Sequence, residues 1–501
     1  MRASGIIMHI TSLPSRHGIG TMGKAAYEFV DFLADSRQKY WQLLPLNPLG
    51  AQESPYSAVS TFAGNPLLID LDLLVEAHWL DAEDVNSVNW GKDPERVDYP
   101  LMRKERLAVL RKAYERFIGA PNRDFIAFVK EQQSWLQDYA LYEALHTKYE
   151  QAWTQWPAEI RRRDPDALAA CRSEMKYEVA FHYFLQFTFF EQWNKLRNYA
   201  RKKGVEMIGD VPIYVPQDSA DVWANQHLFD LDEEGQPRFV AGCPPDYFSE
   251  DGQMWGNPIY RWDIMKAEGY VWWLKRLEAA AQMYDVIRLD HFRGFESYWA
   301  IPGDSKTART GSWQPGPGMD LIGKVKNYLP KTKFIAEDLG FLTPEVQKLL
   351  QDSGFPGMKV LQFAFDAVTP SSYLPHFHVQ NCICYTGTHD NATLRQWLDE
   401  ANEADLAFAK DYLALNNAEG YAWGVIRGGM STVADLFMAQ MQDYLGLGKS
   451  SRMNVPGTVS PDNWSWRMKA GECTPALSKR IADMTVRYGR AAKLEFSRTG
   501  E

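Results

Sequence analysis

The chain has 501 residues, of which 45% are hydrophobic, and a formal net charge of −10. This acidic balance argues against nucleic acid or an anionic membrane as the main partner, because phosphate binding is built from Lys and Arg. No run approaches the ~18–20 uninterrupted apolar residues of a membrane span, and five cysteines are too few for a disulfide framework.

Short apolar runs of strand length alternate with helical stretches along most of the chain. The expected strands are 5–10, 41–46, 205–211, 286–290, 334–337, 358–365 and 382–386, and an eighth is sought within 434–447. The expected helices between them are 24–36, 270–282, 321–328 and one that begins after Thr343, its N-cap, with Pro344 as first residue. Such alternation predicts a parallel sheet with right-handed crossovers. Because no Gly-rich dinucleotide motif follows any strand, an α/β fold of the (β/α)8 TIM-barrel type is favoured over a Rossmann fold.

The region between the second and third strands differs, because it contains no convincing strand. From about residue 70 to 203 it has the pattern of a helical subdomain inserted into the barrel, with long helices expected at 124–148 and 177–202. The aromatic cluster at 181–190 is interpreted as helix–helix core. We therefore expect one catalytic barrel spanning 1–501, with this insertion as its largest addition.

Four of the expected strands run directly into an acidic residue, namely Asp210, Asp290, Glu337 and Asp390. In a (β/α)8 barrel the carboxyl ends of all strands meet at one rim, where active sites lie. An acid after a strand is also a common helix N-cap. Four together, with no metal-ligand pattern beside them, favour an active site built from carboxylates.

Strand periodicity assigns different tasks to these carboxylates. Side chains alternate between faces, so Arg288 and Asp290 point the same way, into the barrel mouth. A fixed cation this close favours the ionised carboxylate that a nucleophile requires. The second carboxyl group must be protonated at neutral pH; Glu337 is the candidate, although the adjacent Asp338 leaves open which of the two faces inward. Paired carboxyl groups of this kind carry out glycoside chemistry, and Asp390 is a third group for stabilising the transition state.

The runs around these acids, 209–214, 286–296, 335–340 and 386–391, form a distinctive ordered set. The set resembles the amylomaltase (4-α-glucanotransferase, or disproportionating enzyme) family, glycoside hydrolase family 77 of the α-amylase clan. The resemblance extends nearly end to end and includes the runs 54–57, 64–66, 244–258, 454–458 and 463–464.

The resemblance implies a 4-α-glucanotransferase, which transfers a segment of an α-1,4-glucan to the 4-OH of glucose or another glucan. The implied mechanism is a retaining double displacement with Asp290 as nucleophile, Glu337 as general acid/base and Asp390 as transition-state stabiliser. The implied contacts to the donor sugar are Tyr56, Ser54, Asp210, Arg288 and His389. On the acceptor side the implied contacts are Gln253 and Trp255, in an active-site loop insertion at about 240–260, and Asn463 completes the predicted binding residues. For Trp255, anchoring of the loop is as good an interpretation as sugar stacking.

One departure from the family concerns a secondary glucan groove. Some members carry a tyrosine three residues before the Ser-Pro-Tyr motif, where this chain has Ala51. The resemblance therefore leaves the presence of that groove open.

Three other functions remain to be weighed. An α-1,4-glucan hydrolase would use the same carboxylates, and only the exclusion of water separates it from a transferase. A glucan-binding protein without activity is not favoured, because all three carboxylates are present. A metal-dependent hydrolase would need ligands such as His376 and His378, which we place in a loop far from His9.

The expected partners are α-1,4-glucans and maltooligosaccharides, with no nucleic acid and no membrane. We predict no cofactor and no metal, and a monomer or small homo-oligomer. Because the start of the chain lacks a long apolar stretch and a cleavage pattern, the expected location is the cytoplasm. Preferred chain length, cyclisation of long glucans, and use in maltose or in glycogen or starch turnover stay open.

Overall fold

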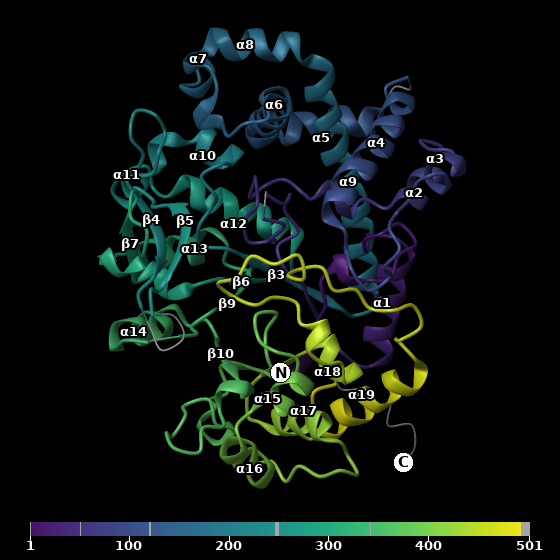
Figure 1. Cartoon of the computed structure of the whole chain (residues 1–501), viewed down its shortest axis with the longest axis vertical. Coiled ribbons are helices and arrows are strands. Elements are labelled where there is room, and N and C mark those ends of the chain that lie inside the picture. The colour runs from purple at the N-terminus through teal and green to yellow at the C-terminus, as the bar shows by residue number, and fades with distance from the viewer. Residues whose placement is uncertain (1, 51, 120–121, 246–249, 341, 492–501) are drawn as a thin grey trace, which may run out of the picture.

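The computed structural model describes residues 2–50, 52–119, 122–245, 250–340 and 342–491. Ala51 and residues 246–249 of the expected active-site loop lie outside these ranges. At the centre is a sheet of eight strands in the order β10-β11-β12-β1-β2-β3-β6-β9 (Figure 1). Its strands are β1 (Ala3–Ile7), β2 (Tyr40–Gln42), β3 (Glu206–Val211), β6 (Val286–Leu289), β9 (Lys333–Ala336), β10 (Gly357–Val360), β11 (Cys382–Tyr385) and β12 (Leu436–Gln440).

Neighbouring strands in this sheet are all parallel, and its two edges meet. The backbone N–H of Ala336 at the end of β9 donates to the carbonyl of Pro356, just before β10, at 3.0 Å. The predicted (β/α)8 barrel is thereby confirmed, and the eighth strand lies within the segment where it was sought.

The barrel interior is filled by apolar side chains at alternate strand positions, as expected when a pleated sheet closes on itself. These residues are Ile7, Ile208, Val286, Ile335, Met358, Val360, Ile383, Tyr385 and Met438. Two positions further along the strands, the same interior parity reaches Asp210, Arg288 and Glu337. The packed core therefore fixes which polar side chains reach the carboxyl-end rim of the barrel.

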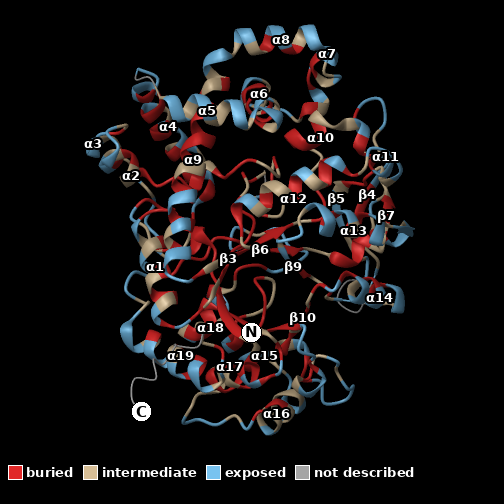
Figure 2. Ribbon diagram, turned by 180° about the vertical axis from the view of Figure 1, so that it is seen from behind, coloured by how far each residue is buried: buried red, intermediate tan, exposed pale blue. Residues whose placement is uncertain are grey.

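Helices surround the barrel, and buried residues line their inner faces, as the red segments of Figure 2 show. Apart from those between β2 and β3, they are α1 (Lys24–Asp35), α10 (Ala220–Ala224), α11 (Trp262–Ala267), α12 (Val271–Met283), α13 (Gly318–Tyr328), α14 (Pro344–Ser353), α15 (Leu394–Glu400), α16 (Glu403–Tyr412), α17 (Tyr421–Ser431), α18 (Met441–Leu445) and α19 (Pro475–Arg487). The predicted cap of α14 is confirmed, because the Thr343 hydroxyl accepts from the Val346 N–H at 3.4 Å.

Between β2 and β3 the regular elements of the described chain are all helices joined by loops, and most of these helices gather at the top of Figure 1. The helices are α2 (Leu71–Glu76), α3 (Ala82–Asn86), α4 (Tyr99–Phe117), α5 (Arg123–Glu131), α6 (Gln133–Tyr149), α7 (Ala158–Arg161), α8 (Pro165–Glu174) and α9 (Lys176–Lys202). The single helix expected at 124–148 is two helices that meet at Gln132, whose backbone leaves the helical region at ψ 6°. Aromatic residues of α4, α5 and α9 pack together, as in the contact between Phe117 and Phe184 at 4.9 Å.

A second, antiparallel sheet is the main feature that the sequence pattern did not predict. It has the order β5-β4-β7-β8, with β4 (Phe239–Cys243), β5 (Gln253–Pro258), β7 (Ser297–Pro302) and β8 (Ser312–Pro315). The region expected as a loop insertion at 240–260 thus contains two of its strands. Strand β4 pairs with β7, which lies about 60 residues later in the sequence. Strand β8 is exposed at every position. Strands β4 and β8 therefore lack the alternation of apolar and polar residues that marks a half-buried strand.

Two strand ends also differ from prediction for a physical reason. The apolar run expected as a strand to residue 365 is a strand only to Val360, after which a 3-10 turn covers Leu361–Phe363. The run expected at 41–46 is a strand only over Tyr40–Gln42. In both cases the later apolar residues, such as Leu43 and Leu361, are buried outside the barrel interior, in the larger core beneath the helices.

The two ends of the described chain meet beside β1. Strand β1 lies between β12 and β2, so it pairs with the last strand of the barrel as well as with the next. Arg490, near the end of the described chain, donates to the carbonyls of Ala3 at 3.0 Å and Met430 at 2.8 Å.

Among the described helices, none is long and apolar enough to cross a membrane.

Candidate active site

Arg288 is the centre of the charged cluster at the carboxyl-end rim. Its Nη1 donates to Asp210 Oδ2 at 2.7 Å and to Asp290 Oδ1 at 2.8 Å, and its side chain is only 3% exposed. Register places Asp210 beside Arg288 on neighbouring strands β3 and β6. Burial lowers the pKa of Arg288, but the two carboxylates outweigh it and raise that pKa well above its ordinary value. Burial raises the pKa of Asp210, and the shared guanidinium opposes that rise. The Asp290 side chain remains 26% exposed.

Glu337 stands beside Asp290 at the end of the next strand. Leu289 on β6 pairs with Ala336 on β9, so the residues that follow them, Asp290 and Glu337, lie side by side. The Glu337 N–H donates to the Leu289 carbonyl at 3.0 Å. Burial raises the pKa of Glu337 to about 7; Arg288 opposes this rise and Asp290 adds to it. Two neighbouring carboxyl groups thus differ in environment, one next to a cation and one desolvated.

The choice between Glu337 and Asp338 is resolved by their hydrogen bonds. Glu337 Oε2 accepts from the His291 N–H at 2.7 Å, and Oε1 accepts from the Leu339 N–H at 2.8 Å. Asp338 turns to the other side of the strand, where Oδ1 accepts from the Met358 N–H at 2.6 Å. Asp338 therefore connects β9 to β10, while Glu337 faces the barrel mouth.

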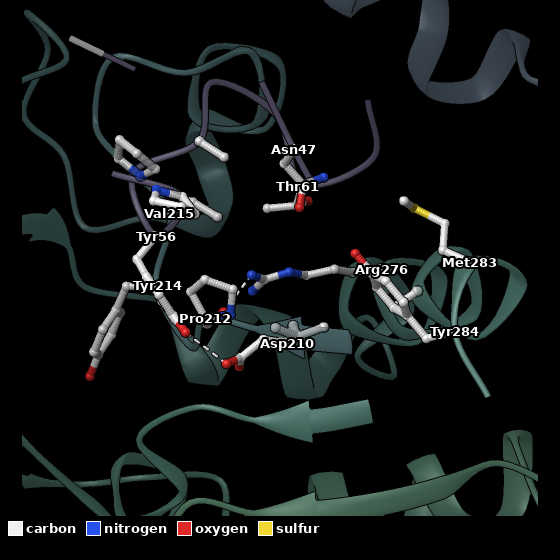
Figure 3. Close-up of a pocket in the computed structure, with 15 residues that line it drawn as sticks. Asn47, Tyr56, Thr61, Asp210, Pro212, Tyr214, Val215, Arg276, Met283 and Tyr284 are labelled. Atoms are coloured by element: carbon white, nitrogen blue, oxygen red, sulfur yellow. Dashed lines mark hydrogen bonds between the residues drawn. The ribbon is translucent and has the colours of Figure 1, made fainter. Parts of the chain in front are cut away.

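Tyr56 links the third carboxylate to this cluster. Its hydroxyl donates to Asp210 Oδ2 at 2.7 Å, a bond drawn in Figure 3. Its ring stacks on His389 with centroids 5.0 Å apart, and His389 Nε2 lies 3.3 Å from Asp390 Oδ2. A continuous series of contacts therefore joins Asp390 to the Asp210–Arg288 pair, so residues far apart in sequence share one site.

Asp390 is held by Arg452 and Asn454, two residues for which no role was predicted. Asn454 donates to Asp390 Oδ1 at 2.6 Å, and Arg452 donates to the Asp390 carbonyl at 2.6 Å. Burial raises the pKa of Asp390, but His389 and Asn454 reverse this and lower it to about 2. The side chain is 43% exposed, so an ionised carboxylate faces the cleft.

Asp443 fixes the loop that carries Asp390 and His389. Its Oδ2 accepts from the Thr386 hydroxyl at 2.6 Å, where the loop leaves β11, and Oδ1 accepts from the Leu394 N–H at 2.7 Å, where α15 begins. One buried carboxylate thus joins both ends of the loop. No sequence signal separated Asp443 and Arg452 from ordinary loop and helix positions. Asn454 lies in the run 454–458, which is part of the family resemblance but carried no predicted role for its side chain.

The two residues predicted to contact the acceptor lie on β5, beside the segment that carries Asp290. Trp255 Nε1 donates to Gln253 Oε1 at 3.2 Å, and the Trp255 ring meets His291 edge-on with centroids 4.9 Å apart. Trp255 is 37% exposed. The strand therefore brings an aromatic surface next to the residue that follows Asp290.

Two other predicted binding residues have local partners. Ser54 Oγ accepts from the Tyr56 N–H at 3.2 Å, which shapes the turn that presents Tyr56. Asn463 accepts from the Val455 N–H at 3.1 Å and donates to the Thr458 carbonyl at 3.0 Å. Asn463 is buried, and these bonds hold the segment after Asn454 in place.

A pocket opens behind Tyr56 and Asp210, between the end of β3 and helix α12 (Figure 3). It encloses about 450 Å³, part of it open to solvent. Arg276 lines it and donates to the Ile213 carbonyl at 3.1 Å and to the carbonyl of Pro212. This arginine holds the chain segment that follows Asp210.

The described residues contain no group of three or more His, Cys, Asp or Glu arranged to hold a metal ion. His376 Nδ1 lies 2.8 Å from the Tyr412 hydroxyl, and His378 Nε2 lies 2.9 Å from the Tyr373 carbonyl. His376 is exposed and His378 is buried, and each has a hydrogen-bond partner within residues 373–412.

A parallel barrel with acidic side chains at adjacent strand ends is typical of an enzyme. A pair of carboxyl groups at such strand ends is the arrangement that enzymes use to break glycosidic bonds. Comparison with known proteins narrows the class. The sequence model of glycoside hydrolase family 77, described as 4-alpha-glucanotransferase, matches residues 8–474. The chain is 45% identical to the 4-alpha-glucanotransferase of Clostridium butyricum over 486 residues, which cover 96% of this chain and 100% of the relative.

Two further relatives agree with this match. The 4-alpha-glucanotransferase of Thermus thermophilus is 43% identical over 495 residues, covering 96% of this chain and 98% of the relative. The solved structure of amylomaltase from Streptococcus agalactiae in complex with acarbose superposes with a TM-score of 0.96 at 41% identity, covering 98% of this chain and 100% of that chain. The chain belongs to the 4-alpha-glucanotransferase family, and the resemblance found in the sequence is confirmed.

Proposed function

We propose that the protein transfers segments of α-1,4-glucans by a double displacement through a covalent glycosyl-aspartate. In the first half, an oxygen of Asp290 bonds to the anomeric carbon, the bond to the glycosidic oxygen breaks, and Glu337 gives its proton to that oxygen. In the second half, the 4-OH of an acceptor gives its proton to Glu337 and bonds to the anomeric carbon, which releases Asp290. Asp390 stabilises the positive charge that develops on the sugar.

The observation that carries this proposal is the pairing of Asp290 with Glu337 on neighbouring strands. Adjacent strands lie about 4.8 Å apart, and the carboxyl groups of retaining glycosidases lie about 5–5.5 Å apart, closer than the pair of inverting enzymes. Arg288 donates to Asp290 Oδ1 at 2.8 Å, while burial raises the pKa of Glu337 to about 7. A carboxyl group with a raised pKa is suited to protonating the leaving oxygen.

The remaining residues bind the substrate in this proposal. Tyr56, Asp210, Arg288 and His389 hold the donor sugar at the scissile bond, and Ser54 orients Tyr56. On the acceptor side, Gln253 and Trp255 offer an amide and an exposed aromatic surface against which a sugar face packs. Asn463 acts through the loop that carries Asn454, because both ends of its amide group bond within that loop.

Glucans are the proposed substrates, either maltooligosaccharides or chains derived from glycogen or starch, and the proposed location is the cytoplasm. Cys171, Cys382 and Cys384 are free thiols, which fits a reducing compartment. The chemistry as proposed requires neither a metal nor an organic cofactor.

The experiment that tests the function is incubation of the purified protein with maltotriose, with products resolved by chain length over time. Transfer predicts released glucose and a ladder of longer maltooligosaccharides, while the total number of reducing ends stays nearly constant. Steadily rising reducing ends with only maltose and glucose would instead establish the α-1,4-glucan hydrolase on the same site. Family membership favours the first outcome.

The pH dependence of the first half-reaction follows from Glu337. Only its protonated form donates to the leaving oxygen, and burial places its pKa at about 7. We therefore expect kcat/KM for maltotriose to fall about tenfold per pH unit above about pH 7. Initial rates from about pH 5 to about pH 9 measure this decline. A kcat/KM that stays constant to the upper end would remove Glu337 as the acid.

A further inference from the structure

His9 lies at the carboxyl-end rim of the barrel, at the same height as Asp210. Ile7 on β1 pairs with Gln42 on β2, and Gln42 pairs with Ile208 on β3. Ile7 and Ile208 fill the barrel interior. The backbone of His9 is still extended, with φ −74° and ψ 149°. Because side chains alternate along an extended chain, His9 and Asp210, each two residues further on, share the inward orientation. His9 is therefore a rim residue to which the proposed mechanism gives no task.

The imidazole ring of His9 is buried, and one of its nitrogens is not paired with the protein. The residue is 4% exposed, and no group among the described residues hydrogen-bonds to Nδ1. Burial, and after it the neighbouring His389, lowers the pKa of His9 to about 3, so the ring is neutral at neutral pH. A buried polar atom that no side chain reaches is normally satisfied by ordered water, because leaving it unpaired is unfavourable.

A small cavity adjoins both His9 and His389. Its polar lining comes from these two rings, from the Ser12 hydroxyl and from the amides of Gln440 and Gln442. Every residue that lines the cavity is buried. The space is about the size of one water molecule. Polar cavities of this size hold ordered water when two to four polar groups surround them, whereas purely apolar ones stay dry.

His389 connects this cavity to the donor side of the site. Its ring stacks on Tyr56 with centroids 5.0 Å apart, and its Nε2 lies 3.3 Å from Asp390 Oδ2. It is also a main cause of the low pKa of Asp390. A rotation of the His389 ring would therefore disturb the stacking on Tyr56 and the pairing with Asp390 together.

We propose that His9 is a positioning residue that orients His389 through a water molecule held in this cavity. The inference rests on the proposed function, in which His389 and Asp390 act on the donor sugar. Nδ1 of His9 forms one hydrogen bond to the water, and the His389 ring forms another. The donor sugar occupies the same place in both half-reactions, so this support serves cleavage and transfer equally.

A high-resolution crystal structure of the unliganded protein tests the water directly. We expect one ordered water within hydrogen-bond distance, about 2.7–3.2 Å, of both His9 Nδ1 and a nitrogen of His389. A dry cavity, or a water that bonds to only one of the two rings, would overturn the inference.

The kinetic test replaces the His9 ring by one of similar size without nitrogens. For His9→Phe we expect kcat/KM for maltotriose to fall about tenfold, the factor that corresponds to one lost buried hydrogen bond. The ratio of transfer to hydrolysis should not change. His9→Asn carries a polar atom close to the place of Nδ1 and should recover most of the activity. If His9 only stabilised the fold, the variants would unfold at lower temperature but keep the wild-type kcat/KM.

The matched control is His182→Phe, the same change at another buried histidine. His182 lies in α9, is 7% exposed and packs against aromatic rings such as Phe181. Burial lowers its pKa to about 4, and neither ring nitrogen has a hydrogen-bond partner within the described part of the chain. It does not line the cavity. His182→Phe should keep the wild-type kcat/KM; an equal loss in both variants would overturn the inference.

A double-mutant cycle with His389→Ala tests whether His9 acts through His389. If it does, adding His9→Phe to His389→Ala causes no further loss in the rate of glucose release. Effects that multiply would overturn the inference. Thermal unfolding of each variant shows whether it is folded, and if His9→Phe is not, His9→Leu takes its place in the cycle. A wild-type protein that only hydrolyses maltotriose would overturn the proposed transfer, whereas the support of His389 is measured by glucose release in either case.

Discussion

Replacement of Asp290 by asparagine is expected to abolish transfer, lowering kcat on maltotriose by about four orders of magnitude or more. An amide oxygen is a poor nucleophile, so the covalent intermediate no longer forms at a useful rate. The fold should persist for an electrostatic reason. Arg288 now serves two carboxylates, and the variant leaves it in a one-to-one pair with Asp210. Initial rates of glucose release, together with thermal unfolding, measure both parts of the expectation.

The control for this variant is Asp304→Asn, the same change at an exposed position on the rim of the second sheet. It should retain wild-type rates. If Asp290→Asn kept even about a tenth of the wild-type transfer rate, Asp290 would not be the nucleophile. Mass spectrometry adds a direct check, because a slowly released donor should add one glycosyl group to the wild-type protein and none to the variant.

The second large effect is expected for Glu337→Gln, which should lower kcat/KM for maltotriose by about three orders of magnitude. Glutamine cannot protonate the leaving oxygen. Its amide also has only one acceptor oxygen for the two N–H groups, of His291 and Leu339, that the carboxyl group now satisfies. The dependence on pH above about 7 should disappear in this variant.

A donor that needs no protonation separates the acid role from mere positioning. Fluoride leaves without a proton, so a glucosyl fluoride should restore most of the first half-reaction in Glu337→Gln, measured as fluoride release. If the variant were as slow with the fluoride as with maltotriose, the residue would not be the acid. Glu233→Gln, at an exposed position, is the matched control and should behave as wild type with both donors.

Strand periodicity was sufficient to predict the charged centre of the site. Arg288 and Asp290 are two residues apart in a short strand, so their common direction follows from the pleat alone. The same pattern could not choose between Glu337 and Asp338, because the ends of β9 were uncertain by one residue. The choice depends on the packing of Ile335 in the barrel interior and on the Met358 N–H, which comes from another strand.

Residues that act through tertiary contacts gave no local signal. Asn454 reaches Asp390 across 64 positions of sequence. The run 454–458 is part of the family resemblance, but its pattern does not indicate this contact. Likewise, the sheet formed by β4, β5, β7 and β8 is held by distant pairing rather than by periodicity. The site is predicted best where one strand determines it and least where several loops converge.

The position of β1 between β12 and β2 has a consequence for biosynthesis. During translation β1 leaves the ribosome first, but one of its edges has no partner until about 430 further residues have been made. At ~5–20 residues per second, that edge stays open for roughly 20–90 s. An open strand edge pairs readily with other chains, so nascent chains that stop short of β12 are the ones that need a chaperone.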